Sequence, residues 1–226
     1  MSIIAIITAR GGSKRIPRKN IKPFMGKPML AYAIEAALNS KIFDEVMVST
    51  DDKGIAEVAL KYGAKVPFMR SEKTSNDFAS TMDVLKEVIE EYKKRGQNFE
   101  ELCCVYPCVP FLTGDILQAA YSKFKQNGID CLIPVVKFSF PIQRAFKIDN
   151  KGLLEYREPE NAPKRSQDLE AMYHDVGMFY FHKTGKLGYQ NAIPFEMEER
   201  YIQDIDNETD WQLAELKYKV MQEDKK

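Results

Sequence analysis

A short apolar strand that runs directly into a glycine-rich basic loop constrains this chain more than any other feature. The apolar run Ile3–Ile7 predicts a buried strand over Ile3–Thr8. The loop Arg10–Asn20 follows at once and begins with two adjacent glycines. Ligands bind at the carboxyl ends of strands in open parallel sheets, so the sequence places this loop at a binding site.

The residue types in the loop indicate that it binds a polyphosphate. Five cationic side chains lie within the ten residues from Arg10 to Lys19. The glycines let backbone N–H groups approach a phosphate closely, and a triphosphate carries about four negative charges to match the cations. The spacing is neither that of a Walker loop nor that of a dinucleotide fingerprint. The alternative is a solvated basic surface loop, which the position after the strand disfavours.

The rest of the chain alternates strand-like and helix-like segments. This pattern predicts a three-layer, doubly wound α/β fold with a mostly parallel, Rossmann-like sheet. Further strands are expected at Glu45–Ser49, Lys65–Phe68, Leu102–Tyr106, Cys131–Lys137, Met178–Phe181 and Tyr201–Ile205. Helices are expected at about Pro28–Asn39, Lys53–Tyr62 and Ser80–Lys94, after the loop Pro107–Thr113 to near Gly128, and from Asn207 or Thr209 to about Met221.

One segment breaks the alternation. The 226 residues fit a single domain, and residues 138–170 read as an insertion within it. The insertion contains a candidate hairpin, Ala145–Tyr156, that turns at residues 149–152.

The composition excludes several classes of function. With 33 basic and 33 acidic residues, no bulk field favours nucleic acid or a membrane. The N-terminal apolar run is too short to cross a bilayer and no targeting segment follows, so a cytoplasmic location is expected. The four cysteines form no Cys-x-x-Cys pair and only two histidines are present, which favours reduced buried thiols over a zinc site.

At this point the chain resembles a known family. Its loop, Arg10-Gly-Gly-Ser-Lys14-x-x-Pro-x-Lys19-Asn20, is similar to the signature of the CMP-acylneuraminate (sialic acid) synthetases. Ser49-Thr50-Asp51, Arg70 and Asp204-Ile-Asp206 also fall where that family has them, and the similarity covers essentially the whole chain.

Within that group the chain resembles most the pseudaminic acid cytidylyltransferases of surface-glycan and flagellin-glycosylation pathways. Tyr106–Phe111, Lys164–Asp168 and Tyr173–Gly177 carry this likeness. The reaction that the resemblance implies joins CTP to a free nonulosonic acid, giving the CMP-sugar and pyrophosphate.

The resemblance implies roles for the nucleotide-binding residues. Arg10 and Lys19 are expected to neutralise the triphosphate and the leaving pyrophosphate, and with Asp206 they are the candidate catalytic residues. The backbone amides of the loop are expected to cradle the phosphates. The other candidate nucleotide-binding residues are Gly11, Gly12, Ser13, Lys14, Asn20, Arg70 and Ser80.

Asp204 and Asp206 are candidate metal ligands. Carboxylates two residues apart on a strand end point the same way, and Mg²⁺ prefers oxygen ligands. The residues alone leave open a capping role for the helix that follows. In the family the matching acidic pair holds the catalytic magnesium, so the resemblance implies Mg²⁺ as cofactor.

The sugar end departs from the sialate enzymes. They carry Gln-Pro-Thr-Ser-Pro where this chain has Tyr106-Pro-Cys-Val-Pro110. Losing an amide and two hydroxyls suits pseudaminic acid, which has a methyl group at C9 in place of a hydroxyl-rich tail. The alternative is that this loop is simply core. The candidate substrate-binding residues are Tyr106, His174 and Asp175, with Arg165 and Gln167 for the sugar carboxylate and Arg144 as a weaker candidate.

The insertion 138–170 matches the segment through which sialate synthetases dimerise and reach the partner's active site, so the resemblance implies a homodimer. Alternatives of the same class are enzymes for legionaminic acid, sialic acid or Kdo, and sugar-1-phosphate nucleotidyltransferases. An alternative of another class is a non-catalytic nucleotide-binding protein, which the pair Asp204 and Asp206 disfavours.

Overall fold

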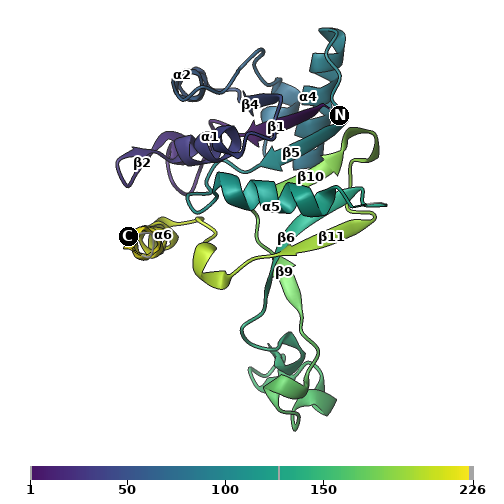
Figure 1. Cartoon of the computed structure of the whole chain (residues 1–226). Helices are drawn as coiled ribbons and strands as arrows, with labels where there is room; N and C mark the ends of the chain where they lie inside the picture. Colours follow the sequence, from purple (N-terminus) through teal and green to yellow (C-terminus); the bar gives the residue numbers. More distant parts are fainter. Residues whose placement is uncertain (1, 127, 224–226) are drawn as a thin grey trace.

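One mixed sheet organises the molecule (Figure 1). The computed structural model describes residues 2–126 and 128–223. The strand order is β11-β6-β10-β5-β1-β4, and β9 pairs with β6 beyond this path. The strands are β1 (Ile3–Thr8), β4 (Glu45–Ser49), β5 (Glu101–Val105), β6 (Cys131–Lys137), β9 (Tyr173–Asp175), β10 (Phe179–Lys183) and β11 (Ala192–Glu196).

The sheet is mostly parallel, as predicted. β1 pairs in parallel with β4 and β5, and β11 pairs in parallel with β6. β10 lies antiparallel between β5 and β6, and β9 is antiparallel to β6.

Helices cover both faces of the sheet (Figure 1). They are α1 (Met29–Ser40), α2 (Lys53–Lys61), α3 (Glu72–Ser75), α4 (Thr81–Lys94), α5 (Gly114–Phe124) and α6 (Glu208–Glu223). Single 3-10 turns occur at Lys19–Ile21, Ile142–Arg144, Pro159–Asn161, Ser166–Asp168, Thr184–Lys186 and Glu199–Tyr201. Two short strands, β2 (Pro23–Phe24) and β3 (Lys27–Pro28), pair with each other in antiparallel orientation. In the described part of the chain, no helix is both long and apolar enough to cross a membrane.

The residues of β1 divide between two apolar clusters, because successive side chains of a strand point to opposite faces. Ile3, Ala5 and Ile7 pack in the cluster that contains the buried residues of α1, α5 and α6. Ile4 and Ile6 pack with the α4 residues on the opposite face. The predicted three-layer arrangement is therefore confirmed.

Beside the carboxyl end of β1, the helical connections between neighbouring strands switch from one face of the sheet to the other. From β1 the chain passes through α1 to β4, while α4 on the other face precedes β5. Crevices open where strand order reverses in this way, and ligands bind there. The fold thus places the Arg10–Asn20 loop beside a crevice.

Two predicted strands are wrong. Lys65–Phe68 pairs only through a single bridge between Lys65 and Met47, and Pro67 has no N–H with which to extend a ladder. In the segment Tyr201–Ile205, the first residue ends a 3-10 turn and the other residues are irregular chain. Ile205 packs into the core, but it has no partner strand.

Two strands were not predicted. β11 contains Pro194 and lies at the edge of the sheet, where a missing N–H is tolerated. β9 has only three residues, all of them exposed.

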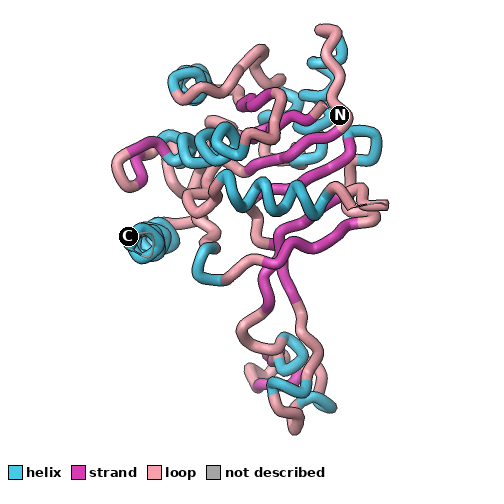
Figure 2. Tube along the Cα trace, in the orientation of Figure 1, coloured by secondary structure: helices cyan, strands magenta, loops and turns pink. Residues whose placement is uncertain are grey.

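The predicted insertion forms an arm that projects from the sheet between β6 and β9 (Figure 1). We call residues 138–172 the arm. Its predicted hairpin is confirmed as β7 (Phe146–Ile148) and β8 (Leu154–Tyr156). The backbone N–H of Gly152 donates to the Asp149 carbonyl across the turn at 3.0 Å, and Gly152 adopts the positive φ that glycine tolerates best. The remainder is loop and short 3-10 turns (Figure 2).

Candidate active site

Two adjoining hollows open at the carboxyl end of β1. The α4 hollow, of about 310 Å³, is lined by Thr8 of β1, by Arg10, by residues of the segment 70–84, and by the two residues that follow β5. The loop hollow, of about 380 Å³, is lined by the Arg10–Asn20 loop. Both include Thr8, Arg10 and Pro107, so they form one continuous cleft. The sizes suit small-molecule binding.

Asn20 fixes the base of the loop. Its side chain is 6 % exposed and its Nδ2 donates to the Arg10 carbonyl at 2.8 Å. The Cys108 thiol donates to Asn20 Oδ1 at 3.3 Å. Burial raises the pKa of that thiol to about 12, so it stays protonated as a donor. Asn20, predicted as a nucleotide contact, lines the loop hollow and also anchors the loop.

The motif Ser49-Thr50-Asp51 holds two of the predicted nucleotide-binding residues. Arg70 donates from Nε to Ser49 Oγ at 3.0 Å and from Nη2 to the Ser49 carbonyl at 2.6 Å. The backbone N–H of Gly11 donates to Asp51 Oδ1 at 2.9 Å. That amide is therefore engaged with Asp51, and the backbone N–H of Ser13 donates to the Gly11 carbonyl at 3.0 Å, so neither is available as predicted to a phosphate in this conformation. The residues of the loop that line the hollow are Arg10, Gly12, Ser13, Lys14, Arg15, Lys19 and Asn20.

Arg70 is buried, and its remaining donors belong to the α4 hollow. The side chain is 8 % exposed and lines that hollow. Burial lowers the pKa of its guanidinium, while nearby Asp51 and Glu87 oppose the change. A guanidinium has five N–H donors, and two are used on Ser49.

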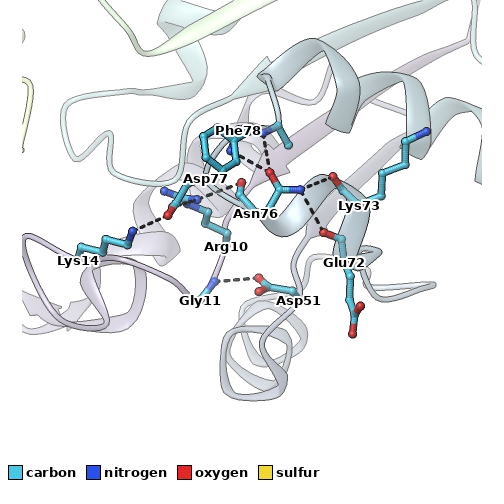
Figure 3. A network of polar contacts seen from close by, with 10 residues as sticks. Arg10, Gly11, Lys14, Asp51, Glu72, Lys73, Asn76, Asp77 and Phe78 are labelled. Atoms are coloured by element: carbon cyan, nitrogen blue, oxygen red, sulfur yellow. Dashed lines mark hydrogen bonds and ion pairs between the residues drawn. The ribbon is translucent and has the colours of Figure 1, made fainter.

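Asp77 pairs with both cations at the rim of the cleft (Figure 3). Arg10 Nη1 lies 2.8 Å from Asp77 Oδ1, and Lys14 pairs with Asp77 Oδ2. Hydrogen bonds from Lys14 and then Arg10 lower the pKa of this carboxyl. Asp77 was not predicted, because a lone acidic residue before a helix carries no local signal.

Lys19 and Asp206 are brought together from opposite ends of the sequence. Lys19 Nζ donates to the Ile205 carbonyl at 2.6 Å and lies 4.0 Å from Asp206 Oδ1. Arg15 Nη1 donates to Asp206 Oδ2 at 2.7 Å. The loop cations and Asp206 therefore meet beside the loop hollow, whereas Asp204 lines another hollow of the molecule.

The residues around Asp206 fit part of a magnesium shell. Ile205 is 1 % exposed, whereas Asp204 on one side of it is exposed and Asp206 is half-buried. Both are hard oxygen donors of the kind Mg²⁺ prefers. Among residues 2–126 and 128–223, no three acidic, histidine or cysteine side chains gather to hold a metal unaided. Phosphate oxygens of a nucleotide are needed to complete such a shell.

Ser80, predicted to contact the nucleotide, caps α4. Its Oγ accepts from the Asp83 backbone N–H at 3.2 Å and donates to Asp83 Oδ2 at 2.7 Å. Asp83 in turn accepts from the Ser80 backbone N–H, which completes a capping box. The neighbours Ala79 and Thr81 line the α4 hollow.

A third hollow adjoins the cleft at Tyr106, which also lines the α4 hollow. This β9 hollow, of about 590 Å³, contains three of the predicted sugar-binding residues and one predicted metal ligand. Its lining consists of Tyr106, Val136, His174, Asp175, Val176, Gly177, Tyr180, Glu199, Ile202, Gln203, Asp204 and Lys217.

Asp175 is fixed in the wall of the β9 hollow. It accepts from Tyr180 Oη at 2.8 and 2.9 Å and from the Gly177 backbone N–H at 2.8 Å. The Tyr106 ring lies 5.5 Å from the Tyr180 ring, and burial raises the pKa of both phenols. Both tyrosines are therefore protonated hydrogen-bond donors. His174 lies beside Phe138, with ring centroids 4.7 Å apart.

The other predicted sugar-binding residues lie on the arm, which projects away from the sheet (Figure 1), and they do not line any of the three hollows. Arg165 Nε pairs with Asp168 Oδ2 at 2.8 Å, and Gln167 is exposed on the same turn. Arg144 ends another short turn of the arm. One chain by itself therefore does not bring these residues to the cleft.

Comparisons with known proteins agree with this geometry. The cytidylyltransferase family model matches residues 4–222. The chain is 44 % identical to the pseudaminic acid cytidylyltransferase of Campylobacter jejuni subsp. jejuni serotype O:2, over 99 % of both chains. It is 30 % identical to the CMP-N,N'-diacetyllegionaminic acid synthase of Legionella pneumophila subsp. pneumophila, again over 99 % of both.

A solved structure shares the fold. The CMP:2-keto-3-deoxy-manno-octonic acid synthetase complexed with CTP superposes with a TM-score of 0.70 at 20 % identity, covering 99 % of this chain and 100 % of that one.

Proposed function

The chain belongs to the cytidylyltransferase family, and from this premise we propose that it transfers CMP from CTP to the anomeric hydroxyl of pseudaminic acid. Pyrophosphate is the second product. The observation that carries the proposal is the 44 % identity, over 99 % of both chains, to a pseudaminic acid cytidylyltransferase. The contacts of Arg15 and Lys19 in the basic loop with Asp206 support it independently.

The two parts of the cleft suit the two parts of CTP. The loop hollow is lined by Arg10, Lys14, Arg15 and Lys19, which match a triphosphate. The α4 hollow is lined by Arg70, Asn76 and Thr81 among others, a mixture of donors and acceptors that suits a base and ribose.

The reaction forms a bond between the sugar oxygen and the α-phosphorus and breaks the bond to the β-phosphate. Such transfers depend on positioning and on neutralising charge. Lys19, held by the Ile205 carbonyl, and Arg10 neutralise the departing pyrophosphate. Arg10 exchanges its contact with Asp77 for phosphate oxygens when the nucleotide binds.

Asp204 and Asp206 would hold Mg²⁺ together with the phosphates. When bound, the ion supplies charge neutralisation and a more acidic sugar hydroxyl. Removal of divalent ions with a chelator is expected to abolish turnover, and added Mg²⁺ to restore it. Asp206→Asn should lower kcat at least about a hundredfold, as loss of a main charge-stabilising group does elsewhere. Full activity in the chelator would contradict the assignment.

Part of the wall of the β9 hollow is apolar, which suits the methyl group of pseudaminic acid. Tyr106, Val136 and Val176 supply apolar surface, while Asp175 supplies a fixed acceptor. A methyl group meets no unpaired polar group on such a wall, whereas a hydroxyl-rich tail needs partners. Legionaminic acid is the second candidate, because the legionaminic acid relative spans the whole chain.

A substrate panel tests the proposal. Pyrophosphate release is measured with CTP, Mg²⁺ and either pseudaminic, legionaminic, sialic acid or Kdo, and with the other nucleoside triphosphates. We expect the largest kcat/KM for CTP with pseudaminic acid. A larger value with another acid, or turnover only with a sugar phosphate, would replace the proposed substrate. Nucleotide binding without any turnover would favour the non-catalytic alternative.

We also propose a homodimer formed through the arm. The arm exposes several large apolar side chains, namely Phe140, Phe146, Ile148, Leu153 and Leu154. Exposed apolar clusters of this kind mark interaction surfaces.

We further propose a place for the product in surface-glycan synthesis, including flagellin glycosylation, because the product is a sugar activated by CMP. Cell fractionation would test the expected cytoplasmic location.

A further inference from the structure

Lys217 of the C-terminal helix reaches the β9 hollow. Its Nζ donates to the Ile202 carbonyl at 2.7 Å, which holds the partly buried side chain beside the segment that leads to Asp204. Of the described residues that line this hollow, Lys217 is the only lysine or arginine. None of the functional roles considered above accounts for it.

The chemistry of the acceptor requires a cation near Asp204. On the proposed function, the acceptor is a 2-keto sugar acid, whose anomeric carbon carries both the attacking hydroxyl and the carboxylate. The two groups are attached to the same carbon, so the carboxylate lies close to wherever the hydroxyl reacts. Asp204 lines the β9 hollow and is expected at the reacting end, so the carboxylate belongs on the same side of the hollow.

The other charges of the hollow are negative. Asp175, Glu199 and Asp204 line it together with Lys217. Burying a carboxylate among acidic side chains without a cation is costly. An ammonium has three N–H donors, and Lys217 uses one on Ile202, which leaves two for a carboxylate.

We propose that Lys217 binds the carboxylate of the acidic sugar in the β9 hollow. The other nearby cations have different partners. Lys19 and Arg15 contact Ile205 and Asp206 at the phosphate end of the cleft. Arg165 is on the arm and pairs there with Asp168. Lys217 is therefore the cation that each chain supplies to its own sugar site.

Three variants test the assignment. Lys217→Met keeps the length of the side chain and removes its charge, and Lys217→Arg keeps the charge. Lys219→Met is the matched control, because Lys219 lies on the same helix but does not line the β9 hollow. Steady-state kinetics give KM separately for the sugar acid and for CTP, and calorimetry with CDP present gives the Kd of the sugar acid without turnover.

Lys217→Met removes a charge-assisted hydrogen bond to the sugar carboxylate. Because such a bond contributes substantially to the free energy of binding, the KM and Kd of the sugar acid should rise about ten- to a hundredfold. The KM for CTP should stay within about twofold, Lys217→Arg should recover most of the affinity, and Lys219→Met should match the wild-type protein. A purely structural role would instead lower the melting temperature and kcat without a selective loss of sugar affinity.

The proposal is overturned if Lys217→Met and the wild-type protein bind the sugar acid equally well, or if the wild-type protein does not bind it. Failure of the proposed function has another signature, namely no pyrophosphate release by the wild-type protein with any sugar acid in the panel.

Discussion

Asp77 lies at the rim of the cleft and pairs with two loop cations that we propose bind the phosphates of the nucleotide. Its two carboxylate oxygens are shared between Arg10 and Lys14. The pattern of glycines and cations identified those two residues from the sequence. Their acidic partner lies 63 to 67 positions further along the chain, and no local pattern predicts such a contact.

Asp77→Asn is expected to lower the KM for CTP. Binding must break the contacts of Asp77 with Arg10 and Lys14, and the amide removes the competing charge. Because these side chains are exposed, the gain should be modest, about threefold. Glu72→Gln is the control, since it removes an exposed carboxylate from the adjoining helix α3. An increase in the KM for CTP would show that Asp77 contributes to nucleotide binding.

His182 makes the free energy of unfolding depend on pH. Its imidazole is fully buried on β10, and neither ring nitrogen has a well-formed hydrogen bond among the described residues. Burial lowers its pKa from 6.5 to about 4, against a smaller opposing effect of the Gly188 backbone. Between these values the unfolded chain binds a proton that the folded protein does not, so stability falls with decreasing pH.

The expected loss from about pH 7 to pH 4 is on the order of 3 kcal/mol. Urea unfolding at a series of pH values measures it. His182→Leu removes the titrating group and should flatten the curve by that amount relative to the wild-type protein. Equal slopes for the two proteins would show that the pKa of His182 is not lowered in the folded state.

At the scale of elements, the strands with continuous apolar runs could be predicted from the sequence. Segments whose pairing depends on their place in the sheet could not. β1, β4 and β6 match their predicted bounds. β1 and β4 are almost entirely buried and pair in parallel, and such strands give continuous apolar runs. β11 has the sequence Ala-Ile-Pro-Phe-Glu, and its Pro194 argues against a strand unless the edge position is known. The segment before α6 was predicted to be a strand because it is apolar, but it is irregular chain. Its Ile205 is buried without pairing to a strand.

The same limit applies to the site. The loop, Arg70 and the acidic pair were found because a motif or a resemblance identifies them. Lys217 was missed because it lies on an ordinary amphipathic helix, where a lysine signals only an exposed face. Its role follows from where α6 packs, which depends on tertiary contacts of Trp211 and Ala214.

Gly114 sets the distance between α1 and α5. A Cβ atom there would lie 2.8 Å from the Ser40 backbone nitrogen and 2.9 Å from the Asn39 carbonyl carbon. Gly114→Ala is therefore expected to force the helices apart and to lower the free energy of unfolding by about 1–3 kcal/mol. This exceeds the gain of up to about 1 kcal/mol that alanine gives in a helix.

Urea denaturation measures the effect of Gly114→Ala. Gly185→Ala serves as the control, because a Cβ atom there meets no heavy atom within 4 Å. Similar stability of the two variants would mean that the end of α1 shifts at little cost.

At the scale of the whole molecule, the arm separates two groups of predicted substrate-binding residues. His174 and Asp175 line the β9 hollow, whereas Arg165 and Gln167 belong to the arm, which projects away from the sheet (Figure 1). A second copy whose arm crosses to the first would unite them. In that arrangement each active site contains residues of both chains, as expected of a homodimer with a twofold axis.

Co-expression of two inactive variants tests this arrangement. Lys19→Ala removes a cation from the loop and is expected to abolish turnover while the fold is kept, and Arg165→Ala alters only the arm. If the arm serves the partner's site, a mixed dimer has one intact site, made from the unaltered loop of one chain and the unaltered arm of the other. Random pairing makes half of the dimers mixed, so about a quarter of the wild-type activity should return.

Co-expressing Lys19→Ala with Arg10→Ala should restore none, because both changes fall in the same half of each site. If the arm serves its own chain, the first mixture stays inactive as well, and sedimentation then distinguishes a monomer from a dimer whose arms do not cross.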